Sequence, residues 1–123
     1  IDLDWHNELN AGDILFIDSS HIIRPEGDVL KIYFEIIPRL KPGVIIHIHD
    51  IFTPKNYLKE WVVDHIRLWN EQYLLEAILM NNNKLKILLA ANYLKHKHYE
   101  KLSLYCPYMD SNSEPSSIYL QVL

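Results

Sequence analysis

The sequence predicts one α/β domain in which buried strands alternate with helices and the final strand is antiparallel. Two short apolar runs, Ile14–Ile17 and Val44–Ile48, are typical of strands buried in a parallel sheet. A helical pattern separates them, and a strand–helix–strand unit with short connections forms a right-handed crossover. The short apolar run Ile118–Val122 ends the chain, and we expect it to pair antiparallel with the strand before it.

The first part of the chain contains a strand and the crossover helix. Residues 1–12 are an amphipathic lead-in, for which we expect a helical turn. Residues 13–18 hold four large apolar residues between two acids, which predicts a strand buried on both faces. From Asp28, which can cap the helix, apolar residues recur every three or four positions up to residue 40. Lys41-Pro42-Gly43 then ends the helix and reverses the chain.

The second part is expected to contain two more helices and two more strands. Pro54 is well placed to begin a helix whose apolar spacing continues to Trp69, and a further helix is expected over residues 70–80. Three asparagines follow, which predicts a break, and residues 84–91 are expected to form the third strand. The segment before the final strand is expected to be a loop, except for a short helix over residues 99–105.

Composition narrows the class of protein. The 123 residues are 49% hydrophobic and 23% charged, an ordinary globular balance, and they are enough for one domain. A net charge of -4 without a basic run predicts no nucleic-acid partner, and the short apolar runs predict no membrane partner. Cys106 is the single cysteine, so no internal disulfide forms, and we expect a buried thiol in a cytoplasmic protein.

The glycines limit how a nucleotide-like cofactor could bind. Only Gly12, Gly27 and Gly43 are present, and none lies in a Gly-x-Gly-x-x-Gly pattern or a P-loop. The chain also begins at Ile1, within what reads as the interior of a domain. We therefore expect the chain to be a fragment of a longer catalytic domain.

Polar side chains follow both buried strands of the predicted parallel pair. Asp18 and His21 come after the first strand, and His49 and Asp50 come at the end of the second. Since ligands bind outside the carboxyl ends of strands in open α/β sheets, these four residues are the candidate site. The pair of acids suits a divalent cation, whereas a histidine suits general base catalysis, and a purely local role for Asp18 as a turn cap stays open. His47 lies deeper along the same strand as His49 and is expected to be a packed, hydrogen-bonded core histidine rather than a ligand.

Several segments resemble the second half of class I S-adenosylmethionine-dependent methyltransferases, in the branch whose fifth strand ends in His-Asp. The similar segments are Asp13–His21, Ile37–Gly43, His47–Phe52, Trp69–Ala77 and Pro115–Leu120. This resemblance implies a partial Rossmann-like sheet, whose strands correspond to the fourth to seventh of the family's sheet, with helices packed on it. Residues 1–123 would then be a single domain, the C-terminal half of a methyltransferase catalytic domain.

The resemblance also implies roles for the strand-end residues. Asp18 and Ser19 would touch the methionine end of S-adenosylmethionine, most of whose site belongs to strands outside this chain. By position, Asp18, His49 and Asp50 would bind a divalent metal, although His49 stands where metal-dependent members more often have an acid. His21 would be the base that deprotonates the acceptor oxygen, so His21 and Asp18 are the candidate catalytic residues.

The function implied is O-methyl transfer to a small-molecule or sugar hydroxyl, by a chain that is inactive without its donor half. The alternative is a receiver-like binding or regulatory module that uses the strand-end acids. A receiver needs a lysine at the end of a later strand, whereas Lys84 and Lys86 lie early in theirs. We also expect the free edge of the first strand to favour homo-oligomers.

Overall fold

Four strands form one mixed sheet in the computed structural model, which describes residues 3–123. The strands are β1 (Ile14–Ile17), β2 (Ile45–His49), β3 (Leu85–Ala90) and β4 (Ser117–Val122), in the spatial order β1-β2-β4-β3. β1 and β2 are parallel, and β4 lies antiparallel between β2 and β3. The predicted α/β class, the parallel pair and the antiparallel final strand are confirmed.

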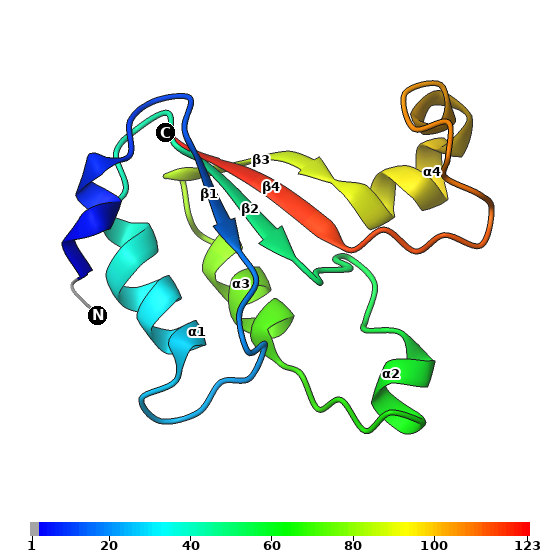
Figure 1. Cartoon of the computed structure of the whole chain (residues 1–123), viewed down its shortest axis with the longest axis horizontal. Helices are drawn as coiled ribbons and strands as arrows, with labels where there is room; N and C mark the ends of the chain where they lie inside the picture. The colour runs from blue at the N-terminus through cyan, green and yellow to red at the C-terminus, as the bar shows by residue number, and fades with distance from the viewer. Residues whose placement is uncertain (1–2) are drawn as a thin grey trace.

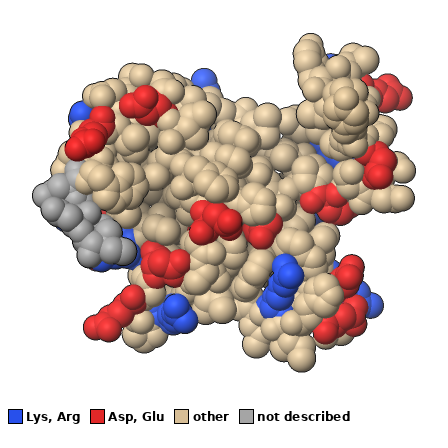
Figure 2. Space-filling view, viewed as in Figure 1, with Lys and Arg blue, Asp and Glu red and all other residues tan. Residues whose placement is uncertain are grey.

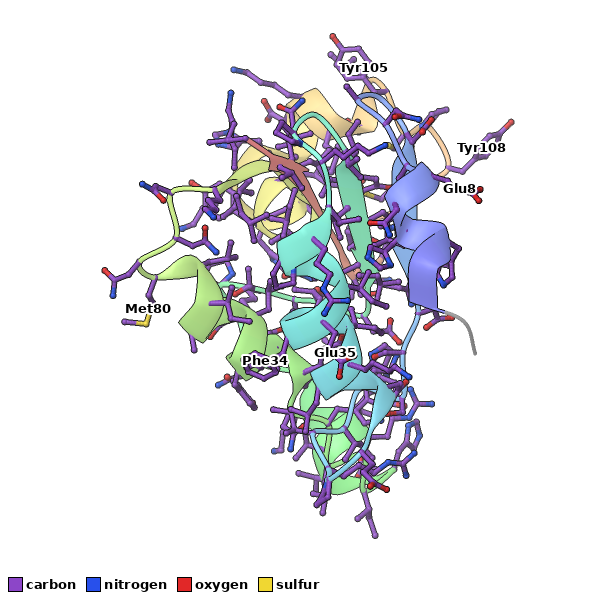
Figure 3. The ribbon with its side chains drawn as sticks, turned by 90° about the vertical axis from the view of Figure 1, so that its left-hand side faces the viewer. Glu8, Phe34, Glu35, Met80, Tyr105 and Tyr108 are labelled. Atoms are coloured by element: carbon purple, nitrogen blue, oxygen red, sulfur yellow. The ribbon has the colours of Figure 1, made fainter. Side chains whose placement is uncertain are left out.

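The helices lie mainly on one side of this sheet. They are η1 (Leu3–Glu8), α1 (Asp28–Lys31), η2 (Ile32–Ile36), η3 (Ile37–Arg39), α2 (Lys59–Val63), α3 (Glu71–Leu79) and α4 (Ala91–Ser103). Figure 1 shows α1 and α3 on the same side of the strands, with α2 and α4 farther along the molecule. The outer surface of this helical layer carries Phe34 and Met80, which point into solvent (Figure 3). Within residues 3–123, no helix has the length and apolarity needed to cross a bilayer.

The sheet is buried on one face and open on the other. Leu15 and Ile17 of β1 are buried in the core, whereas Ile14 and Phe16 are 58% and 55% exposed. The prediction that this strand is buried on both faces is therefore wrong. In a strand, alternate side chains point to opposite faces, and helices α1 and α3 cover only one of them.

The crossover between β1 and β2 is helical as predicted, but its geometry changes along its length. It begins as α1, widens into the π-helix η2 and tightens into the 3₁₀-helix η3 at Pro38, which has no N–H to donate. Asp28 does not cap it, since Gly27 is the N-cap residue. The Asp28 carboxylate instead accepts hydrogen bonds from the amide and hydroxyl of Ser20, which ties down the loop after β1.

The helix predicted from Pro54 to Trp69 is mostly absent, since only α2 forms there. The aromatic side chains pack on one another instead. Trp61 and Trp69 meet edge to face at 5.4 Å, and the guanidinium of Arg67 lies 4.7 Å and 5.0 Å from the two ring centroids. These tertiary contacts stabilise an irregular chain path that the helical spacing alone could not reveal.

The α4 segment also differs from expectation. The helix begins at Ala91, eight residues before the predicted start at Tyr99, and is kinked at His98. Its first half carries few apolar residues, and it is held by hydrogen bonds from Asn92 and Lys95 to Glu114. Cys106 follows the helix and is exposed, so the expectation of a buried thiol is wrong.

Candidate functional site

The carboxyl ends of β1 and β2 carry the predicted site residues. Asp18 directly follows β1, and Asp50 directly follows β2, with Ile17 and Ile48 paired across the two parallel strands. His49 is the last residue of β2. In Figure 2, acidic side chains gather near the middle of the face, where these strand ends lie in Figure 1.

The structure brings the four predicted strand-end side chains together. The Nε2 atom of His21 lies 3.4 Å from Oδ1 of Asp18 and 3.7 Å from Oδ2 of Asp50. The Nδ1 atom of His49 lies 3.1 Å from Oδ1 of Asp50 and 3.8 Å from Oδ1 of Asp18. The site is therefore a cluster of two carboxylates and two imidazoles; which role each side chain has stays a prediction.

A fifth side chain, that of Glu71, was not predicted. Its Oε2 atom accepts a hydrogen bond of 2.8 Å from Nδ1 of His21 and one of 2.6 Å from the hydroxyl of Ser19. Glu71 has no exposed surface, although it lies in the first turn of α3, 50 positions after His21. The sequence carried no signal for it, because an acid in the first turn of a helix is usually exposed.

Two residues of the cluster have a left-handed backbone. The φ angles of His21 and Asp50 are 57° and 56°, a region that side chains other than glycine adopt at a cost. The carbonyl of His21 accepts hydrogen bonds from the amides of Asn70 and Glu71, at 3.0 Å and 3.2 Å. The amino end of α3 thus holds the strained turn after β1 and so positions the imidazole of His21.

The cluster is closed toward the core and open toward solvent. His21 is 5% exposed, and the Trp69 ring packs against its imidazole at a centroid distance of 4.3 Å. Asp50 is buried, whereas the side chain of Asp18 is 57% exposed. The side of Asp18 is therefore the solvent-facing side of the cluster.

The surroundings of His21 raise its pKa. Burial lowers the pKa of this imidazole, because it disfavours the charged form. The hydrogen bond to Glu71 and the negative charges of Glu71, Asp50 and Asp18 more than offset that effect, so the pKa lies above its ordinary value. His21 is thus a stronger base than a free histidine.

Comparison with known proteins finds a similarity over the first part of the chain. Residues 3–51 match a family model described as a methyltransferase domain. The resemblance is confirmed for this segment, which contains β1, β2 and the four predicted site residues after them. No curated protein and no solved structure matches the chain. The resemblance of Trp69–Ala77 and Pro115–Leu120 lies outside the matched range and stays a prediction.

The residues predicted to bind a metal, Asp18, His49 and Asp50, are not arranged to hold one. Within residues 3–123, no group of three or more His, Cys, Asp or Glu side chains is arranged to hold a metal ion. Oδ1 of Asp50 already accepts a hydrogen bond from the hydroxyl of Ser116, at 2.9 Å, and His21 faces both acids. The mechanism proposed for these residues therefore has no step that involves a metal ion.

Nor do the described residues form a cradle for the methyl donor, S-adenosylmethionine, which the family implies. A side chain at Gly43 would meet Ala11, and one at Gly27 would meet Arg24, so these glycines serve packing within the chain. The hydroxyl of Ser19, predicted to touch the donor, donates a hydrogen bond to Glu71, and its role toward the donor stays a prediction.

Proposed function

We propose that this chain is the acceptor side of an S-adenosylmethionine-dependent methyltransferase that acts on a hydroxyl of a small molecule or a sugar. One observation carries the proposal. In a segment that matches a methyltransferase domain, a buried histidine, His21, has its Nε2 atom 3.4 Å from a carboxylate oxygen of Asp18 and 3.7 Å from one of Asp50. This is the arrangement that a general base for an acceptor hydroxyl requires.

The residues act on the acceptor alone in this proposal. Nε2 of His21 takes the proton from the acceptor hydroxyl, and the oxygen becomes a stronger nucleophile. Asp50 and Asp18 stabilise the imidazolium that results, and the exposed carboxylate of Asp18 passes the proton to solvent. S-adenosylmethionine, when bound, supplies the methyl group that the oxygen receives. Burial of His21 against Trp69 keeps bulk water from the base.

The donor site is supplied from outside these residues. We infer that the chain works as the carboxyl-terminal half of a larger catalytic domain, whose missing strands carry the glycine-rich loop, and that it is inactive alone. Its other partner is the small-molecule acceptor. The exposed free thiol of Cys106 favours the reducing cytoplasm as its compartment.

The receiver-like alternative gains no support from the sheet register. Lys86 pairs with Gln121, which pairs in turn with Ile45 at the start of β2. This lysine therefore lies at the opposite end of β2 from Asp50. A receiver needs its lysine beside the acids, so we retain methyl transfer as the proposed function.

The test measures transfer of a labelled methyl group from S-adenosylmethionine to a panel of phenolic, aliphatic and sugar hydroxyls. The enzyme is the longer protein in which this chain follows a glycine-rich strand–turn–helix. We expect His21→Gln to lower kcat by about 10²–10⁴-fold, the usual contribution of a general base.

The matched control is His47→Gln. His47 lies on the same strand as His49, but it stacks on Tyr119 and contacts the hydroxyl of Ser117 on the open face of the sheet. The proposal fails if no acceptor is methylated, or if both substitutions lower kcat equally.

A further inference from the structure

We propose that Glu71 is a positioning residue that fixes the orientation and tautomer of His21, so that Nε2 faces the acceptor. The inference rests on the proposed function, in which His21 is the base. It assigns a role to a residue outside the segment that matches the methyltransferase domain. It also explains why a carboxylate is buried where α3 meets the loop after β1.

The hydrogen bonds of Glu71 determine which imidazole nitrogen carries the proton. A carboxylate has only acceptor atoms, so Nδ1 of His21 must donate in the 2.8 Å contact with Oε2. In the neutral imidazole, Nε2 then holds the lone pair and is free to accept a proton. The second donor to Oε2, the hydroxyl of Ser19 at 2.6 Å, holds the carboxylate in place.

Because Glu71 is fully buried, a purely structural role for its carboxylate would cost free energy. The residue has no exposed surface, and the buried hydroxyl of Tyr33 also lies against its carboxylate. A buried carboxylate is stable only when charge or hydrogen bonds offset the loss of water. Here the offset comes from His21, from Ser19 and from the amino end of α3, where backbone N–H groups favour negative charge.

The same helix end also holds the backbone of His21. The amides of Asn70 and Glu71 donate to the His21 carbonyl, and the side-chain oxygen of Asn70 accepts a hydrogen bond of 2.6 Å from the amide of Ile23. The ring of Trp69 packs against the imidazole. The segment formed by Trp69, Asn70 and Glu71 therefore fixes both the main chain and the ring of His21. An acid orients a histidine in a similar way in catalytic triads.

The test is the imidazole tautomer of His21, read from the ¹⁵N shifts of its two ring nitrogens. Spectra are recorded on the whole chain at alkaline pH, where the ring is neutral. We expect the wild type to carry its proton on Nδ1. In Glu71→Gln, we expect the tautomer ratio to move toward protonated Nε2 by about tenfold, because a charged acceptor is lost.

The matched control is Glu76→Gln, which removes another carboxylate of α3. Glu76 accepts from Gln72 and Thr53 and does not contact His21. The control should leave the His21 shifts unchanged. Glu71→Met, which offers no acceptor but has a similar length, serves as a second variant, and far-UV circular dichroism reports whether each variant folds.

Two outcomes overturn the inference: a wild type with the proton on Nε2, or a tautomer ratio that Glu71→Gln does not change. The wild-type spectrum decides the matter even where both Glu71 variants unfold. The tautomer measurement needs no methyl donor, so a result that contradicts the role of Glu71 is distinct from a result that contradicts the proposed function. If the tautomer is as expected but no acceptor is methylated, Glu71 orients an imidazole that serves another reaction.

Discussion

The hydroxyl of Ser116 donates a hydrogen bond of 2.9 Å to Oδ1 of Asp50, and the carbonyl of Ser116 accepts one from the amide of Ile51. These contacts join the segment before β4 to the left-handed turn that follows β2. Asp50 is thereby held with its other oxygen, Oδ2, toward His21. The last part of the chain thus completes a site whose other acid and base come from the first part.

Asp50→Ala should abolish methyl transfer by the longer protein while the fold survives. The substitution removes the buried carboxylate that faces the imidazolium formed when His21 takes a proton. The measurement is labelled methyl transfer, with far-UV circular dichroism as the test of folding. Asp64→Ala, which removes an exposed acid after α2, is the control. A rate for Asp50→Ala equal to that of the control would contradict the prediction.

The raised pKa of His21 predicts opposite effects of alkaline pH on rate and on stability. The neutral base form increases as the pH rises above the ordinary value of 6.5, so kcat should rise until the pH passes the raised pKa. The stability that the ion pairs contribute is fully present below pH 6.5 and is lost as the pH rises through the folded-state value. The groups that face His21 are Glu71, Asp50 and Asp18.

Urea unfolding of the wild type and of His21→Gln at acid and alkaline pH measures the stability effect. The difference in unfolding free energy between the two proteins should be smaller at the alkaline pH. A difference that grows with pH would show that the imidazole is buried in its neutral form.

Glu114 should stabilise the packing of α4 above acid pH. Burial raises the pKa of this carboxyl, but hydrogen bonds with His96 and Asn92 lower it to about 2. Its contribution is therefore present above the ordinary value of 4.5 and is lost as the pH falls toward 2. At pH 7, Glu114→Gln should lower the unfolding free energy by about 1–2 kcal/mol. Glu100→Gln, on the exposed side of α4, should have almost no effect, and an equal loss in both variants would refute the prediction.

Gly43→Ala should destabilise the fold more than Gly12→Ala. Both glycines have a positive φ, at 88° and 92°, so both substitutions strain the backbone. A Cβ atom at residue 43 would also lie 2.5 Å from Cβ of Ala11, whereas none of the described atoms lies within 4 Å at residue 12. We expect a cost of about 1 kcal/mol at Gly12 and more at Gly43. Equal midpoints of urea unfolding would show that Ala11 moves aside freely.

The edge strand β1 should cause the chain to associate, which we propose as the origin of a homo-oligomer. Among the described residues, β1 pairs with β2 alone, and its exposed side chains, Ile14 and Phe16, lie on the open face of the sheet. Phe16→Lys should reduce the mass measured by light scattering at a fixed protein concentration. Ile87→Lys, on the opposite edge strand, should change it less. A monodisperse monomer of the wild type would contradict the prediction.

The local pattern of the sequence determined the strands, the parallel pair and the meeting of Asp18 with Asp50. Short apolar runs predict strands, and because β1 and β2 are parallel neighbours, their carboxyl ends lie at the same edge of the sheet. The same logic predicted the helices after β1 and before β3. It also predicted β4, whose antiparallel direction the structure confirms.

Only the tertiary structure decided which contacts complete the site. Glu71 reaches His21 across 50 residues of sequence, and no local pattern tells a buried carboxylate from one in solvent. The irregular path from Pro54 to Trp69 follows from aromatic packing, which overrides helical spacing. The exposure of Phe16 depends on which faces the helices cover. Propensity acts over a few residues, whereas burial is a property of the whole fold, so the strands were predictable, whereas the exposure of their faces and the side-chain contacts of the site were not.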